Sequence, residues 1–187
     1  MVLVVTLVVL VVVVLLLLWA VSAYNRLVRQ RNQVQAASAQ IDVQLKRRHD
    51  LIPNLVETVK GYVAYESSTL EAVVRARQNA VNANGAPAAQ RAEAEGELTA
   101  VLSRLMVLSE AYPDLKANQN FGALQNELAT TEDKIAYARQ FLNNAVQTYN
   151  TSIETVPTNI VAGLGKFRRE QFFQASGDER GNVSVQF

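Results

Sequence analysis

The chain has no cysteine and only one histidine, His49, among its 187 residues. Without cysteine it forms no disulfide bond, no thiolate metal site and no thiol nucleophile. A di-iron helical bundle needs Glu-x-x-His pairs on facing helices, which one histidine does not supply. The sequence also lacks a glycine-rich phosphate loop, a Gly-x-Ser-x-Gly elbow and a Ser/His/Asp set. These absences predict a protein that is not an enzyme and that carries no cofactor, metal or catalytic residue.

The chain has little excess charge, with 18 Lys and Arg against 17 Asp and Glu and a net charge of +1. Proteins that bind nucleic acid through their phosphates usually carry a strongly basic surface. The balanced composition therefore predicts no nucleic-acid partner.

Residues 1–23 form a long apolar run whose only strongly polar member before Ser22 is Thr6. As a helix the run spans roughly 30 Å, the thickness of the hydrocarbon core of a bilayer. We expect an uncleaved transmembrane anchor. One alternative is a cleaved signal peptide with Val21-Ser22-Ala23 as its cleavage site, although the basic n-region is missing. Another is a core helix of a soluble protein, which is rarely apolar on all sides.

Basic residues follow the apolar run, and only Asp42 opposes them between residues 24 and 48. They are Arg26, Arg29, Arg31, Lys46, Arg47 and Arg48. The positive-inside rule predicts a single-pass protein of the bacterial cytoplasmic (inner) membrane, with its N-terminus outside and the rest in the cytoplasm. The cations either only fix this topology or also bind anionic lipids of the bilayer, at about 1 kcal/mol per residue.

Beyond residue 23 the composition favours helices, and four prolines interrupt their periodicity. The prolines are Pro53, Pro87, Pro113 and Pro157. Near Pro53 two interpretations remain open. Either Asp50 caps a new helix, with His49 and Asp50 helping to stop the preceding one, or a single long helix kinks there. After Pro113, Asn118 or Asn120 is expected to cap the next helix.

Apolar residues recur with heptad spacing, most regularly over residues 121–149. This seam consists of Phe121, Leu124, Leu128, Thr131, Ile135, Ala138, Leu142, Ala145 and Tyr149. Looser seams are Leu27, Val34, Ile41 and Leu45; Leu55, Val59, Tyr62, Leu70 and Val73; and Leu98, Val101, Leu102, Leu105 and Leu108. The pattern predicts an all-α fold, with an N-terminal transmembrane helix (1–23) followed by an antiparallel (up-down) helical bundle of about four long helices (24–156).

The tail, residues 157–187, differs in composition, with glycines and with aromatic residues beside cations. It folds back onto the bundle, lies at a bilayer interface or docks on a partner. Val183–Phe187 is a short candidate for strand addition to a partner. Candidate assembly or docking residues are Ala36, Ala37, Asp50, Glu57, Phe167, Phe172 and Phe173. Since small residues let membrane-proximal helices approach closely, we expect a homo-oligomer.

Several blocks of sequence identify a resemblance that covers nearly the whole chain from Tyr24. They are Tyr24–Val28, Arg31-Asn32, the uninterrupted Gln40–Tyr62, Tyr112–Asn118, Leu124-Gln125, Leu128, Thr131-Glu132, Ala138–Phe141, Tyr149–Thr151 and Pro157–Phe173. They resemble the bacterial LemA family. The resemblance implies an N-terminal anchor and an antiparallel helical bundle, and it brings no established catalytic activity. One branch of that family is associated with magnetosome membranes. The chain departs from the family pattern at Ala37, where an aromatic residue is common, and at Tyr65, where histidine is common.

Two functions fit these observations. The first is a non-enzymatic, self-associating scaffold that organises the membrane. The second is an accessory or regulatory docking subunit of a membrane enzyme, such as a protease or phosphatase system, with residues 157–187 as the contact to a membrane protein partner. The mass of the extracted protein and the identity of co-purifying proteins separate the two.

Overall fold

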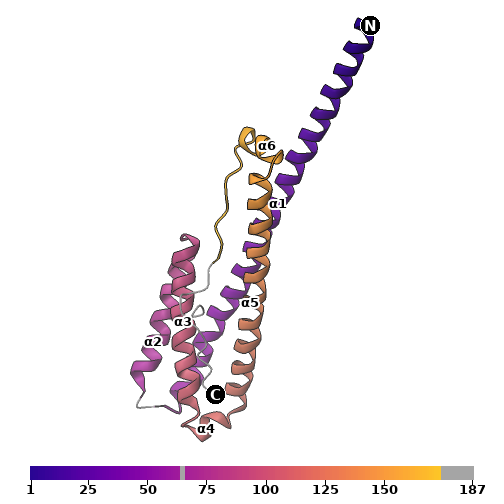
Figure 1. Ribbon diagram of the computed structural model, residues 1–187. Helices are drawn as coiled ribbons and strands as arrows, with labels where there is room; N and C mark the ends of the chain where they lie inside the picture. Colours follow the sequence, from indigo (N-terminus) through magenta and orange to yellow (C-terminus); the bar gives the residue numbers. More distant parts are fainter. Residues whose placement is uncertain (64–65, 174–187) are drawn as a thin grey trace, which may run out of the picture. The chain divides into compact units, whose positions relative to one another are not determined.

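The computed structural model describes residues 1–63 and 66–173. Tyr65 and the strand predicted at Val183–Phe187 lie outside the described residues. Regular structure in the described ranges is helical throughout, which confirms the all-α fold class (Figure 1). The helices are α1 (Val2–Lys60), α2 (Ser67–Asn82), α3 (Ala88–Ser109), α4 (Pro113–Lys116), α5 (Gln119–Glu154) and α6 (Thr158–Leu164).

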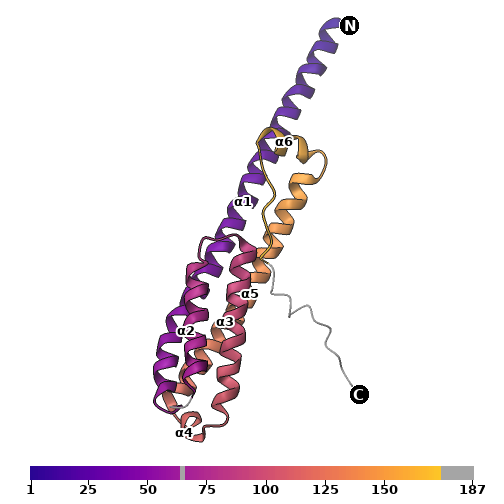
Figure 2. The same ribbon diagram turned by 90° about the vertical axis from the view of Figure 1, so that its left-hand side faces the viewer.

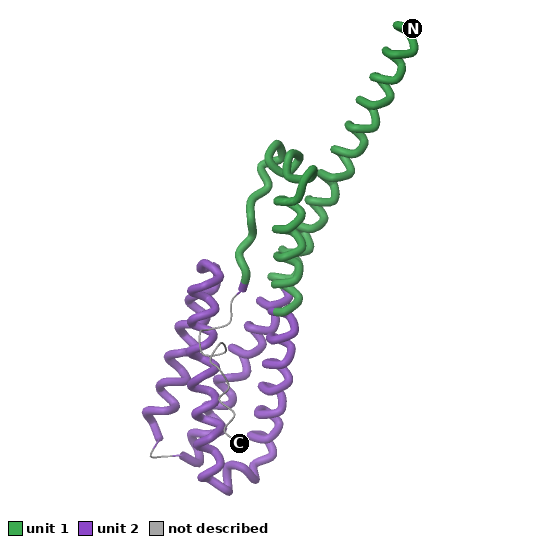
Figure 3. The backbone as a smooth tube through the Cα atoms, in the orientation of Figure 1, with its two compact units in different colours: residues 1–39, 140–172 green, residues 40–139, 173–187 purple. Residues whose placement is uncertain are grey.

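The chain divides into two compact units, shown in different colours in Figure 3. Unit 1 contains residues 1–39 and 140–172, and unit 2 contains the described residues of 40–139 together with Phe173. The division falls inside α1 and inside α5, so each of these helices contributes residues to both units. The units are defined by which residues pack together, and their limits differ from those of the predicted segments 1–23, 24–156 and 157–187.

Pro53 lies inside α1, which continues to Lys60. The prediction that His49 and Asp50 stop or cap a helix is therefore wrong. Proline is tolerated here because α2 supplies a hydrogen bond that the helix lacks, as described below. The helix ends instead at Lys60. The apolar seam Leu55–Val73, which was expected on one helix, is therefore divided between α1 and α2.

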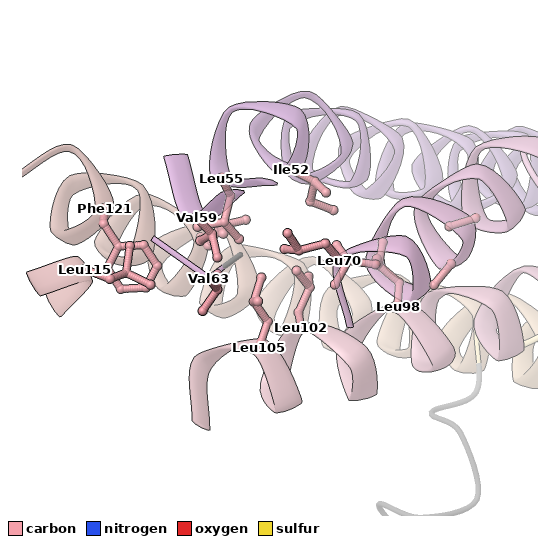
Figure 4. Close-up of a cluster of buried hydrophobic side chains, with 14 residues drawn as sticks. Ile52, Leu55, Val59, Val63, Leu70, Leu98, Leu102, Leu105, Leu115 and Phe121 are labelled. Atoms are coloured by element: carbon pink, nitrogen blue, oxygen red, sulfur yellow. The ribbon is translucent and has the colours of Figure 1, made fainter. Parts of the chain in front are cut away.

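The core of unit 2 is a cluster of apolar side chains contributed by α1, α2, α3, α4 and α5 (Figure 4). Its most deeply buried members include Ile52, Leu55, Val73, Leu98, Leu105, Leu115 and Phe121. Figures 1 and 2 show that the consecutive helices of this unit run in opposite directions. Burying large apolar side chains contributes about 1.5–3 kcal/mol each, so this shared core is what holds the four long segments together.

Heptad spacing identified the buried face of α5 correctly. Every member of the seam from Phe121 to Tyr149 is buried, except Leu124, which is half-buried. The expected cap is also present, because Asn118 Oδ1 accepts hydrogen bonds from the backbone N–H groups of Asn120 (2.8 Å) and Phe121 (3.1 Å). These bonds satisfy donors that the first turn of a helix leaves free.

In unit 1, the part of α1 from Ala23 to Ala39 packs beside the end of α5, and Gln30 Nε2 donates a hydrogen bond to Ser152 Oγ (2.9 Å). Before Ala23, the apolar side chains of α1 are not buried by protein. Within the described ranges, α1 is the one helix that is long and apolar enough to cross a membrane, and none of its apolar window is buried. The alternative of a soluble core helix is wrong, because such a helix would be covered.

Candidate functional sites

A buried charged cluster connects α1, α3 and α5 inside unit 2. We call it the Arg48 cluster; it comprises Arg48, His49, Glu95, Thr99 and Glu132. Arg48 Nη1 donates to Thr99 Oγ1 (3.0 Å) and to Glu132 Oε2 (2.7 Å), and Nη2 pairs with the Glu95 carboxylate. Only 1% of Arg48 is exposed. An arginine removed from water so completely requires such partners, because an unpaired buried charge is very costly.

The second partner of Glu95 is His49, whose Nε2 lies 2.9 Å from Glu95 Oε1. That approach is short in distance but is not aligned as a hydrogen bond, since Nε2 has no aligned partner among the described residues. Burial by itself raises the pKa of Glu95, but the contact with His49 and the charge of Arg48 outweigh it, so the net pKa of Glu95 is lowered. Glu95 is thus held as a carboxylate inside the unit.

Because Arg48 is buried inside unit 2, its side chain is not free to contact a membrane surface, and its predicted part in the membrane topology stays a prediction. A run of three cations (residues 46–48) does not reveal that the third one points into the core. Its neighbours Lys46 and Arg47 are exposed and pair with carboxylates, Lys46 with Asp50 (2.6 Å) and Arg47 with Glu127. The contact with Lys46 lowers the pKa of Asp50.

A cavity of about 430 Å³ lies beside the cluster, lined by residues of α1, α2 and α3. Four of its charged residues form two ion pairs, Arg91 with Asp42 and Lys46 with Asp50. Arg77 donates through Nε to the carbonyl oxygen of His49 (2.7 Å). In the part of the chain that the structure describes, no group of three or more His, Cys, Asp and Glu side chains is placed to hold a metal ion. The arrangement fits a structural ion-pair network.

A second group of contacts lies in unit 1, where the chain leaves the apolar run. The rings of Tyr24 and Phe167 pack edge to face with centroids 5.4 Å apart. The guanidinium of Arg31 stacks over the Phe167 ring at 5.5 Å from its centroid. A Cβ added at Gly165 would lie 2.6 Å from Phe167 Cε2 and 3.2 Å from Tyr24 Cε2, so glycine permits this close approach. The described part of the tail therefore folds back onto helices of its own unit, as one of the alternatives predicted.

Polar contacts hold the same tail against α5. Tyr149 donates through its hydroxyl to the carbonyl oxygen of Arg168 (2.9 Å), and burial raises the pKa of Tyr149. The Asn150 amide donates to the carbonyl oxygen of Glu170 (2.9 Å) and accepts from its N–H (3.0 Å). Sequence reasoning did not assign roles to Asn150, Glu95 or Glu132. The available signal for Glu95 was its helical register, which places a glutamate in line with Ala92, Leu98 and Leu102 on the apolar stripe of residues 88–109.

The predicted docking residues differ in accessibility. Ala36, Asp50 and Glu57 are exposed, and 39% of Phe172 is exposed. Ala37 is fully buried, Phe167 is half-buried, and Phe173 is buried with Arg91 and Arg139 stacked over its ring. A docking role for the exposed residues stays a prediction, as does the membrane-surface role of Arg26, Arg29 and Arg31, which are all exposed.

The described residues are all-helical, and the uncovered apolar stretch of α1 gives them one candidate membrane anchor, so the chain has the features of a helical, membrane-anchored protein. The profile of the LemA family matches residues 37–187, and the chain belongs to the LemA family.

Among its relatives, Protein LemA of Metamycoplasma hominis is 29% identical over 161 residues, covering 86% of this chain and 73% of that protein. Magnetosome protein MamQ 2 of Paramagnetospirillum magneticum is 28% identical over 175 residues, covering 81% of this chain and 64% of its own length. Magnetosome protein MamQ of Magnetospirillum gryphiswaldense is 26% identical over 174 residues, covering 80% of this chain and 64% of its own length. The chain thus spans less than two thirds of the two magnetosome relatives.

Proposed function

We propose that this LemA-type membrane protein is a non-enzymatic scaffold, anchored by α1 in the bacterial cytoplasmic membrane with the remaining helices in the cytoplasm. The observation that carries the proposal is the exposed apolar stretch of α1 followed at once by Arg26, Arg29 and Arg31, all exposed. Cations on this flank favour a cytoplasmic position for the segment that follows. The bilayer, including anionic lipids, is then the first partner.

Self-association is the second part of the proposal. Ala36 and Ala39 are exposed and Ser38 is half-buried, so a stretch of small side chains is available on α1 shortly after the anchor. Small side chains allow helices of neighbouring molecules to approach closely. The magnetosome relatives are named for a membrane compartment, which agrees with a role in organising membranes.

The deciding experiment is the mass of the full-length protein extracted in a membrane-solubilising polymer, measured by light scattering. A discrete homo-oligomer that Ala36→Trp dissociates, while Ala123→Trp at an exposed site on α5 leaves it intact, supports the scaffold. A monomer without companions contradicts it.

The orientation has its own test, because a chain without cysteine accepts single labels cleanly. Val107→Cys lies on α3 with 74% of Val107 exposed. A membrane-impermeant maleimide should label this cysteine only after the cytoplasmic side is opened. Labelling from outside intact cells would reverse the proposed orientation.

An accessory docking subunit of a membrane enzyme is the second candidate function. A groove of about 840 Å³ on unit 2, lined in part by Val56, Val63, Leu70 and Val74, favours it. Mass spectrometry of the extracted particles distinguishes the two candidates, since a foreign subunit present in fixed ratio to this chain would favour docking.

A further inference from the structure

We propose that the α6 segment, residues 156–169, lies in the headgroup layer of the bilayer that α1 crosses and forms a second membrane contact. The inference rests on the proposed membrane anchoring but not on self-association. Its partner is a lipid surface containing anionic headgroups.

The first argument is an uncovered apolar face. Ile160 and Leu164 lie four residues apart on α6 with exposed fractions of 61% and 83%, and Val156, in the turn before the helix, is 73% exposed. Residues four apart lie on the same side of a helix. Val161 and Ala162, by contrast, are buried at 8% and 2% exposure. A short helix that is buried on one side and apolar on its outer side has the pattern of an interfacial element.

The second argument is the position of this face within unit 1. Ala23 is the first side chain of α1 that protein buries, and Tyr24 follows it. The α6 segment reaches this point, because Gly165 and Phe167 both pack against the Tyr24 ring. Figures 1 and 2 both show α6 beside α1 where the uncovered part of α1 ends. The apolar face of α6 therefore continues the apolar surface of the anchor at the depth where the chain leaves the bilayer.

The third argument is charge. Arg26 and Arg29 are exposed on α1, and Lys166, Arg168 and Arg169 are exposed on the α6 segment. Glu154 pairs with Arg169 (3.0 Å), which leaves an excess of cations in this region. Cations beside apolar and aromatic side chains bind anionic lipid surfaces, because the apolar groups enter the headgroup boundary while the charges stay at the phosphates.

The experiment uses the full-length protein in phosphatidylcholine vesicles, with and without phosphatidylglycerol, carrying one environment-sensitive fluorophore on a single cysteine. The labelled variants are Leu164→Cys on α6, Leu10→Cys in the anchor and Val107→Cys on α3. Lipids brominated on their acyl chains quench only fluorophores that reach the bilayer. We expect quenching and a blue-shifted emission at positions 10 and 164, and neither at 107.

The outcomes separate this inference from the anchor. Absence of quenching at position 10 would overturn the anchoring on which the inference rests. If the fluorophore at position 10 is quenched but the one at position 164 is not, as at position 107, the anchoring stands and the proposed contact of α6 with the bilayer is overturned. A blue shift at 164 without quenching by brominated lipid also overturns it, because protein, such as a second copy, would then cover α6.

A charge-removal series tests the anionic component. In the Leu164→Cys background, Lys166→Gln with Arg168→Gln should abolish the increase in quenching that phosphatidylglycerol produces. Arg104→Gln, at an exposed arginine on α3, is the matched control and should leave the increase unchanged. Equal quenching in both lipid mixtures before any substitution would show that anionic headgroups are not recognised.

Discussion

Arg77 donates a hydrogen bond through its Nε–H to the carbonyl oxygen of His49 at 2.7 Å. In an uninterrupted helix this carbonyl would accept from the N–H four residues later, but that residue is Pro53, which has no N–H. A side chain of α2 thus replaces the backbone donor that α1 lacks. The contact explains how α1 tolerates an internal proline.

Replacing Arg77 with methionine should lower the free energy of unfolding by about 1–3 kcal/mol, because a half-buried carbonyl loses its donor. Denaturant unfolding of the detergent-solubilised protein, followed by circular dichroism, measures this change. Arg75→Met, at an exposed site on the same helix, is the control and should have little effect.

A double-mutant cycle identifies the cause. Pro53→Ala restores a backbone donor for the His49 carbonyl, so Arg77→Met should cost less in that background. An unchanged cost would mean that Arg77 stabilises unit 2 in some other way, for example through the cavity that it lines.

Breaking the Arg48 cluster should be among the most damaging changes in unit 2. Arg48→Met leaves the buried Glu95 carboxylate without its arginine and is expected to cost about 3–5 kcal/mol. Arg47→Met removes the neighbouring exposed pair with Glu127 and should cost no more than about 1 kcal/mol. Thermal unfolding of both variants tests this contrast, and comparable losses would contradict the burial of Arg48.

Stability should depend on pH through Glu95. Its pKa is lowered from the ordinary glutamate value of 4.5, so the folded state favours its charged form. The resulting stabilisation is present above pH 4.5 and is lost as the pH falls from there through the lowered pKa. The difference in unfolding free energy between the wild type and Glu95→Gln should therefore shrink on acidification. A difference that grows on acidification would reverse the assigned direction of the pKa shift.

Gly165→Ala should loosen the tail from the Tyr24–Arg31 part of α1. The added Cβ would meet the Phe167 ring at 2.6 Å, and that ring is already held between Tyr24 and Arg31. Overpacking of this kind costs about 1–3 kcal/mol. Gly163→Ala is the matched control, since nothing lies within 4 Å of its added Cβ. Limited proteolysis after Arg168 and Arg169 should accelerate in the first variant only.

Local features of the chain were predictable. The apolar run, the seam of α5 and the Asn118 cap all depend on residues within a few turns of one another. The sequence does not decide the path of the helix through Pro53, because the compensating donor, Arg77, lies 28 residues from the His49 carbonyl. The burial of Arg48 was not predictable, because its partner Glu95 is 47 residues away. A run of three cations does not show which side chain points into the core. Binding partners of the protein also cannot be predicted in this way, because they are not recorded in a pattern of neighbouring residues.

The pairing of Asn150 with Glu170 fixes the register of the tail. One side-chain amide makes both hydrogen bonds that a neighbouring strand would make, to the N–H and to the carbonyl of a single residue. Residues in a stretched segment advance by about 3.3 Å each, which exceeds the length of a hydrogen bond. A deletion of one residue between Phe167 and Glu170 therefore cannot preserve both this pairing and the contact of Phe167 with Tyr24. The two contacts together therefore fix the number of residues between Phe167 and Glu170.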